Sequence, residues 1–524
     1  MTTVSIYRLN WPDLDAAIRP GLESVQAHQL DLAGHRALRL DRVSGDHPPD
    51  WADTLNEMTG LPFDQAVRSA SALLLVDLGD ASFAISFGHG RHLLDRYAWE
   101  RDFGLRVALR TLSPRRVAEV TRTALDTGAR LDLTCVPAGA GVREFGIEQH
   151  TDLVKHIGGH ADSLDLGWTG GRGGRVRLDG RDALKIRLTP DPAGLVRDLR
   201  AIQAAAESEP VPDLAFMEGI RPLTGGSRLR TAEDALAARI AAPPDGGRTG
   251  DPVGVSLPVE LLGADVTGLT VLFQGRTEQV ESVDLLLIRR LLAPVRLDQR
   301  YAALREATVL ATVDGQTVPA ETSLGQWLVA DLTIDGERYV FQQGRFYVLT
   351  DSYRQALRKE VERLMAQPIG WTLPPWPVGM SERDYNEKEA GGRGFVCLDR
   401  GLVTSRVHPQ GIEVCDLVSP DNQLICVKRA GRSAALSHLF GQAIVAAEAI
   451  VQGDETWSGL LDRLPEPRRA AMPRRPDFVF GIQLTKGELT PDSLFTFSQV
   501  TLHRAARHLE RLGMEVAVVG IPTR

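Results

Sequence analysis

Residues 411–431 decide how the C-terminal third of this chain folds, and they read GIEVCDLVSPDNQLICVKRAG. Two apolar runs, 412–418 and 424–429, predict strands, and the SPDN cluster between them predicts a tight turn. Strands joined by so short a turn pair in antiparallel fashion. We therefore expect a hairpin that brings Asp416 on one strand near Lys428 on the next.

The segments around this hairpin predict an alternating domain. In chain order, the pattern predicts a helix over 381–390, a strand over 394–398, the hairpin, a helix over 434–452, a strand over 477–484, a helix over 494–512 and a strand over 515–521. The predicted order is α-β-β-β-α-β-α-β.

Two stretches rich in proline and glycine, 241–258 and 368–377, predict domain boundaries. Local hairpins are predicted from 72–76 with 83–87 and from 329–334 with 338–341, and a charged helix from 353–366. The fold class is α/β (mixed α+β) and multidomain. The three predicted parts are an N-terminal α/β region (1–245), a middle β-rich region (255–370) and a C-terminal domain (378–524).

The composition narrows the function classes. The chain has 524 residues, of which 43% are hydrophobic and 24% charged, and its formal charge is −8. These values exclude wholesale disorder, collagen and coiled coil, and the acidic balance argues against binding nucleic acid by charge alone. The four cysteines form no CxxC pair, and no secretory signal or apolar membrane span is present in the pattern. We expect a cytoplasmic protein with no membrane contact.

The Asp416 and Lys428 pair suits phosphodiester hydrolysis. A carboxylate can hold Mg²⁺ (or Mn²⁺), which polarises a phosphate and lowers the pKa of the attacking water. A neighbouring lysine can orient that water and offset the negative charge that grows on the phosphate.

This segment resembles the PD-(D/E)XK nuclease superfamily, in particular its Mrr-like restriction-endonuclease branch. The resemblance implies a restriction-endonuclease-like three-layer α/β domain in which Glu387 is the helix acid, Asp416 the central metal ligand and Lys428 the motif lysine. Cys426 stands where the superfamily usually has Glu, Asp or Gln, which removes one metal ligand. Glu413 is a candidate replacement, but strand alternation sends it to the face opposite Asp416. Glu387 is therefore the better second acid.

The following helix carries His438 and Gln442 at i, i+4 spacing, so the two side chains share a face. In the resembled nucleases this helix brings a polar residue to the active site, and the alternative is a polar helix start with a satisfied histidine. Several arginines are candidates for phosphate contacts, with a solvated loop as the alternative. They are Arg429, Arg432, Arg468, Arg469, Arg474 and Arg475.

Six motifs along the chain are specific enough to indicate a family. They are FGHGRHLL (87–94), DFGL (102–105), YNE (385–387), EVCDL (413–417), VKR (427–429) and LSHLF (436–440) followed by Gln442. With them the chain resembles a family of uncharacterised, sporadically distributed bacterial proteins that are often carried on mobile or defence-linked gene clusters. This resemblance implies a setting in defence and a partner protein from a defence system, and it implies no activity.

Two weaker signals lie in the N-terminal region. Gly88, Gly90 and Arg91 follow a predicted strand and could cradle an anion, with a structural turn as the alternative. His156 and His160 have the i, i+4 spacing of a metal-binding pair on a helix, but the two glycines between them argue against a helix there.

Three functions remain open at this stage. The first is a metal-dependent nuclease, or a nuclease-derived nucleic-acid-processing protein, in bacterial defence against mobile DNA, with DNA expected as the partner rather than RNA. The second is a catalytically degenerate nuclease fold that binds nucleic acid or scaffolds a complex. The third is a nucleotide or small-ligand sensor built around residues 88–91.

Overall fold

The structure is a computed structural model of the chain. It describes residues 2–22, 24–43, 45, 48–49, 52–95, 98–124, 131–137, 139–142, 152–169, 174–223, 226–242, 253–261, 264, 266–313, 320–390, 394–429, 433–484 and 488–524.

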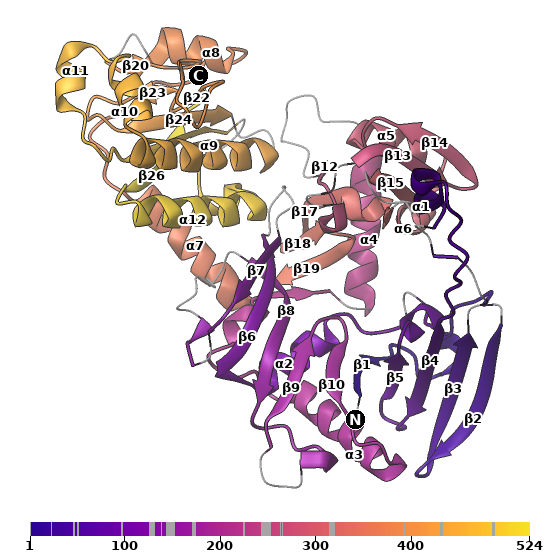
Figure 1. The fold of residues 1–524 in the computed structure, drawn as a ribbon. Coiled ribbons are helices and arrows are strands. Elements are labelled where there is room, and N and C mark those ends of the chain that lie inside the picture. Colours follow the sequence, from indigo (N-terminus) through magenta and orange to yellow (C-terminus); the bar gives the residue numbers. More distant parts are fainter. Residues whose placement is uncertain are drawn as a thin grey trace.

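A ten-stranded sheet forms the N-terminal part (Figure 1). Its order is β2-β3-β4-β5-β1-β10-β9-β8-β6-β7, and every neighbouring pair is antiparallel. The strands are β1 Thr3–Arg8, β2 Val25–Leu32, β3 His35–Val43, β4 Ala70–Asp77, β5 Ser82–Phe87, β6 Leu112–Ala124, β7 Leu131–Cys135, β8 Asp152–Ala161, β9 Val176–Gly180 and β10 Leu184–Arg187. The pairing of β4 with β5 confirms the hairpin predicted there.

Helices cover one face of this sheet. Helix α2 (Phe103–Thr111) packs against β8 and β9, and α3 (Pro192–Glu207) lies beside α2. Alternate residues of the strands, such as Val120 and Ile157, point into the apolar cluster under α2. Their neighbours in the strands therefore point to the other face. The short helix α1 (Ala52–Thr59) follows β3.

The middle part contains two antiparallel sheets, β11-β19-β18-β17-β12 and β14-β13-β15-β16. Their strands are β11 Ile220–Pro222, β12 Val253–Val255, β13 Val266–Phe273, β14 Arg276–Val280, β15 Thr308–Val313, β16 Ala320–Ser323, β17 Leu328–Ile334, β18 Glu337–Gln342 and β19 Arg345–Leu349. The helices are α4 Gly226–Ala241, α5 Leu285–Leu292 and α6 Arg300–Glu306. The pairing of β17 with β18 confirms the second predicted hairpin, whose turn residues Asp335 and Gly336 both have positive φ.

The predicted boundary near residue 245 lies later in the chain than the first elements of the middle part. Strand β11 pairs with β19, and the buried residues of α4, Ala232 and Leu236, belong to the apolar core of the middle sheets. The chain thus enters the middle part before the proline- and glycine-rich stretch, because apolar contacts rather than composition decide which sheet a segment joins.

Helix α7 (Asp351–Met365) leads from the middle part to the C-terminal part (Figure 1). Tyr353 and Leu357 pack with residues of the middle sheet, whereas Val361 and Leu364 lie in the C-terminal core. The predicted helix over 353–366 is confirmed, and it packs in the apolar cores of both parts.

The C-terminal sheet has the order β20-β23-β24-β25-β26. The first three strands are antiparallel, and β24, β25 and β26 are parallel. Its elements are α8 Glu382–Asp384, the π-helical turn η9 Tyr385–Ala390, β20 Val396–Cys397, β21 Leu402–Val403, β22 Ile412–Glu413, β23 Leu417–Val418, β24 Leu424–Arg429, α9 Ser433–Gln452, α10 Asp454–Leu461, α11 Glu466–Ala471, β25 Phe478–Gln483, α12 Thr496–Arg511 and β26 Val516–Ile521. The multidomain mixed α+β class is confirmed, with α9 and α12 packed together beside this sheet.

One predicted strand of this domain is interrupted. The run 412–418 forms two short strands, β22 and β23, which pair with different partners, β21 and β20. Residues 414–416 connect them, and Val414 and Cys415 are buried in the C-terminal core. This break decides the direction of the side chains that flank it.

Polar contacts join the three parts. Arg345 in β19 lies 2.9 Å from Asp182 of the N-terminal part. The buried carboxylate of Asp331 in β17 accepts a hydrogen bond from the backbone N–H of Thr496 in α12. Among the described residues, no helix combines the length and the apolarity that crossing a bilayer requires.

Candidate functional site

Three carboxylates converge where the predicted strand breaks. Asp399 follows β20, Glu413 ends β22, and Asp416 precedes β23. One carboxylate oxygen from each residue lies within 4.8 Å of the other two. A cluster of oxygen donors is the kind of ligand set that Mg²⁺ and Mn²⁺ prefer.

The backbone around Asp416 fixes its carboxylate at this point. The Asp416 N–H donates to the Ile425 carbonyl at 3.0 Å, and its carbonyl accepts from Leu398 N–H at 2.7 Å. Its Oδ2 accepts from the Val427 N–H at 2.6 Å. Asp416 therefore bridges the first and third strands of the meander, and its side chain has little freedom to leave the cluster.

The cluster is electrostatically unfavourable without a cation. Burial is the main cause that raises the pKa of Asp416, and repulsion from Glu413, Glu382 and Asp399 adds to it. The hydrogen bond from Val427 acts in the opposite direction, and the resulting pKa is about 8. Asp416 thus carries a proton at neutral pH unless a cation compensates the acidic neighbours.

Lys428 lies on β24 and reaches the helix that precedes the sheet. Its Nζ donates to Glu382 Oε1 at 2.7 Å, and both side chains are about one-third exposed. Ser381 caps this helix, because its Oγ accepts from the Asp384 N–H at 3.1 Å. Glu382 is consequently the first helical residue, and it links Lys428 electrostatically to Asp416.

Two polar contacts hold the other acids. The fully buried Asn386 donates from Nδ2 to Asp399 Oδ2 at 3.3 Å. Glu413 Oε1 accepts from the Arg400 N–H at 2.6 Å. Asn386 belongs to the YNE motif, so the structure gives this motif a positioning role toward the acid cluster.

Glu387, predicted as the helix acid, is not one of the three clustered acids. It forms an ion pair with Arg383 at 2.8 Å and is 43% exposed. Glu382 lies in α8, whereas Glu387 lies in the π-helical turn η9 that follows. The helix that was expected to supply an acid does so, but the acid that reaches the lysine is Glu382.

Cys426 lies outside the acid cluster, whereas Glu413 belongs to it. Cys426 is buried in the C-terminal core. The argument from strand alternation that excluded Glu413 fails, because alternation holds only within a continuous strand and this one is broken at 414–416. Asp399 was not predicted, although it directly follows a predicted strand, which was the available signal.

His438 and Gln442 both lie on α9, with His438 exposed and Gln442 half-buried. Among the described residues, the His438 imidazole does not join the ligand atoms of Asp399, Glu413 and Asp416.

The predicted phosphate-binding arginines contact the protein itself. Arg429 donates to Gln483 and to the Met380 carbonyl, and its guanidinium lies over Trp376. Backbone carbonyls accept from three of the others: Ser419 and Gly394 from Arg468, Leu461 from Arg469, and Ile450 from Arg474. Arg475 is exposed beside Gly513. Arg432 lies outside the described residues.

The predicted anion loop is a packed turn. Gly88 has a φ of +58°, and a Cβ at Gly90 would lie 2.0 Å from the Ala72 carbonyl oxygen. Close packing against β4 therefore accounts for both glycines without a ligand. Arg91 is exposed beside this turn.

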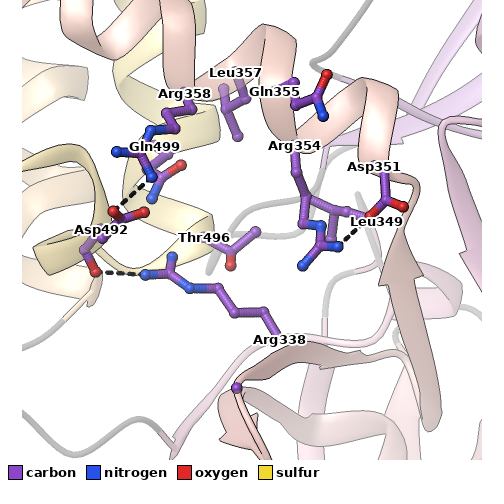
Figure 2. Close-up of a pocket in the computed structure, with 11 residues that line it drawn as sticks. Arg338, Leu349, Asp351, Arg354, Gln355, Leu357, Arg358, Asp492, Thr496 and Gln499 are labelled. Atoms are coloured by element: carbon purple, nitrogen blue, oxygen red, sulfur yellow. Dashed lines mark hydrogen bonds and ion pairs between the residues drawn. The ribbon is translucent and has the colours of Figure 1, made fainter.

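A cavity of about 280 Å³ lies outside the acid cluster, between β18, α7 and α12 (Figure 2). Arg338 donates to the backbone carbonyls of Asp492 and Leu494 at 2.6 and 2.7 Å. Arg358 lies 2.6 Å from the Asp492 carboxylate. Because these guanidinium groups already bind acceptors of the chain, we interpret the cavity as part of the joint between the middle and C-terminal parts.

The fold and this site define a multidomain α+β protein with an acidic cluster beside a lysine. Residues 4–522 match a family model described as a family of unknown function, DUF6119. The chain belongs to this family, which confirms the prediction of an uncharacterised family. A search of the curated proteins gives no match. The activity must therefore be argued from the site.

Proposed function

We propose that the C-terminal part is a metal-dependent phosphodiester hydrolase that acts on nucleic acid. The observation that carries this proposal is the convergence of Asp399, Glu413 and Asp416 next to the Lys428–Glu382 ion pair. The three acids would hold Mg²⁺ or Mn²⁺, which when bound supplies a Lewis acid for the phosphate and a water of lowered pKa.

The residues of the chain have distinct roles in this proposal. Asp416 is the central ligand, because the sheet backbone fixes it and burial favours a bound cation over an isolated charge. Glu382 positions Lys428. The Lys428 ammonium then orients the attacking water and offsets the negative charge that develops on the phosphate.

The substrate and setting extend the same proposal. We infer DNA rather than RNA as the substrate, and defence against mobile DNA as the setting, from the resemblances given by the sequence motifs. The N-terminal and middle parts would then bind the substrate or a partner protein of the defence system. Arg468, Arg469 and Arg474 have no part in this proposal, because backbone carbonyls of the chain accept from their guanidinium groups.

Cleavage assays on the full chain test the proposal. Plasmid, single-stranded DNA and RNA are incubated with Mg²⁺ or Mn²⁺, and the variants Asp416→Asn and Lys428→Met are compared with Glu281→Gln, a change at an exposed residue of the middle part. We expect metal-dependent cleavage that falls at least about 100-fold in the first two variants and is unchanged in the third. Cleavage that survives both substitutions would contradict the assignment.

A scaffolding or nucleic-acid-binding module is the second candidate, and two observations favour it. Cys426 is apolar at the usual acid position, and Lys428 is held in an ion pair. This function predicts nucleic-acid binding that is independent of metal and of Asp416, with no cleavage of any of the three substrates. That outcome would replace the hydrolase.

A further inference from the structure

A second group of ligand-type side chains lies in the N-terminal sheet. Glu119 on β6, His156 on β8 and Asp179 on β9 each place one donor atom within 4.8 Å of the other two. Glu119 and Asp179 both pair with Gly158 of the strand between them. His156 lies two residues before Gly158, so all three side chains share the face opposite α2.

Gly158 creates the space between the two carboxylates. A Cβ at this position would lie 2.5 Å from Asp179 Oδ1 and 3.0 Å from Glu119 Oε1. The register of β8 against β6 also shifts on both sides of the segment 156–158. Such irregularities re-aim side chains in a sheet. Gly158 and Gly159, which separate His156 from His160, therefore belong to a strand, and the side chains around Gly158 converge on one point.

The imidazole is oriented toward that point. His156 is 3% exposed, and its Nδ1 lies 3.3 Å from Thr121 Oγ1. Its Nε2 lies 3.9 Å from both Glu119 Oε1 and Asp179 Oδ1. Within the described part of the chain, Nε2 has no hydrogen-bond partner, because both distances exceed the range of a hydrogen bond.

These distances favour a metal ion over a proton between the groups. In the tautomer whose Nδ1–H donates to Thr121 Oγ1, the Nε2 lone pair faces two carboxylate oxygens, and a bound cation would compensate this arrangement. A proton on Nε2 cannot bridge 3.9 Å. An ion with bonds of ~2.0–2.2 Å needs only a small closing of the side chains. The contact of Nδ1 with Thr121 is also the second contact that metal-bound histidines usually make.

We propose that Glu119, His156 and Asp179 form a binding site for a divalent transition metal, separate from the C-terminal acid cluster. One imidazole nitrogen and two carboxylate oxygens suit Zn²⁺, Mn²⁺ or Fe²⁺ better than Mg²⁺. The Glu119 and Asp179 side chains are 32% and 22% exposed, so the site opens to solvent on the carboxylate side. Three protein ligands with an open side are typical of metal sites that bind a further small ligand or water.

Metal titration of the full chain tests this site. The protein is stripped with a chelator and titrated with Zn²⁺ by calorimetry in the Asp416→Asn background, which disables the C-terminal cluster. We expect one Zn²⁺ per chain. Adding His156→Gln, or Gly158→Ala, which fills the space between the carboxylates, should weaken Zn²⁺ binding on the order of 100-fold.

His160→Gln on the same strand is the matched control and should leave the affinity unchanged. Co²⁺ provides a readout that does not depend on whether the His156→Gln and Gly158→Ala proteins fold. In the stripped Asp416→Asn protein, bound Co²⁺ should show the visible spectrum of a site with nitrogen and oxygen ligands. Zn²⁺ binding that is equal in the His156→Gln, Gly158→Ala and His160→Gln proteins would overturn the proposal, as would the absence of any bound Zn²⁺ or Co²⁺ in Asp416→Asn.

Discussion

The C-terminal acid cluster and the N-terminal His156 cluster each bring three ligand atoms within 4.8 Å of one another, but by different means. Asp399, Glu413 and Asp416 come from a broken strand and the turns beside it, whereas the N-terminal groups come from three strands in register. The first cluster contains only carboxylates. The second contains an imidazole.

Their electrostatics also differ. Burial and acidic neighbours raise the pKa of Asp416 to about 8. In the N-terminal cluster, the contact with His156 is the main cause that lowers the pKa of Asp179, and Arg177 and Lys185 act in the same direction. The comparison teaches that the C-terminal acids repel one another, whereas in the N-terminal cluster the neighbouring His156, Arg177 and Lys185 favour the charged form of Asp179.

The largest expected effect separates Glu382 from Glu387. Glu382→Gln removes the partner that positions Lys428, and we expect DNA cleavage to fall about 100-fold. Glu387→Gln removes an exposed ion pair with Arg383 and should reduce cleavage far less. Rates of Mg²⁺-dependent cleavage by the two variants give the measurement. A larger loss in Glu387→Gln would restore Glu387 as the helix acid.

The pH dependence of the free energy of unfolding tests the raised pKa of the Asp416 carboxyl. Its folded-state pKa of about 8 lies above the value of ~3.9 in an unfolded chain, so its stabilising contribution is complete below pH 4 and is lost as the pH rises through 8. For the metal-free protein, we expect the free energy of unfolding to fall by roughly 2–4 kcal/mol between pH 5 and pH 8 from this group. Denaturant titrations should show a smaller fall in Asp416→Asn. If the unaltered protein and Asp416→Asn lost stability equally between pH 5 and pH 8, the raised pKa of Asp416 would be contradicted.

Metal selectivity sharpens the contrast between the clusters. Asp416→Asn should weaken Mn²⁺ binding at the C-terminal cluster about 10- to 100-fold and leave the Zn²⁺ site at His156. Glu119→Gln should have the opposite effect. Calorimetric titrations of both variants with both ions give the measurement. Loss of both ions in both variants would show that the clusters are not independent.

The smallest expected effect concerns Asn386, which is buried and donates a hydrogen bond to Asp399. Asn386→Ala should weaken Mn²⁺ binding about tenfold, because outer contacts orient metal ligands without binding the ion. Asn386→Asp, which keeps the shape but adds a negative charge, distinguishes positioning from charge. Unchanged affinity in Asn386→Ala would assign the YNE motif to packing alone.

The parts of the fold that depend on local pattern could be predicted from the sequence. Turn residues and alternating apolar runs identified the β4–β5 and β17–β18 hairpins, and helical periodicity identified α7, α9 and α12. The predicted α-β-β-β-α-β-α-β order lacks α10 and α11, which lie between α9 and β25, and the short strand β21, and it counts β22 and β23 as one strand.

The side chains that meet in space could only partly be predicted. The sequence placed Asp416 and Lys428 on neighbouring strands because one hairpin joins them. Glu413 was misplaced because its strand breaks at 414–416, where Val414 and Cys415 are both buried, and a local pattern does not contain such a break. The His156 cluster depends on the register of three strands that are distant in sequence. No local pattern contains that register.

Crystals of the full chain grown with Mn²⁺ would test the central claim most directly, through the anomalous scattering of the ion. We predict an anomalous peak bounded by Asp399, Glu413 and Asp416, with Lys428 close by and a shortening of the distances among the three carboxylates. Crystals of good quality that show no peak there, with Lys428 still bound to Glu382, would contradict the metal centre and favour the scaffolding module.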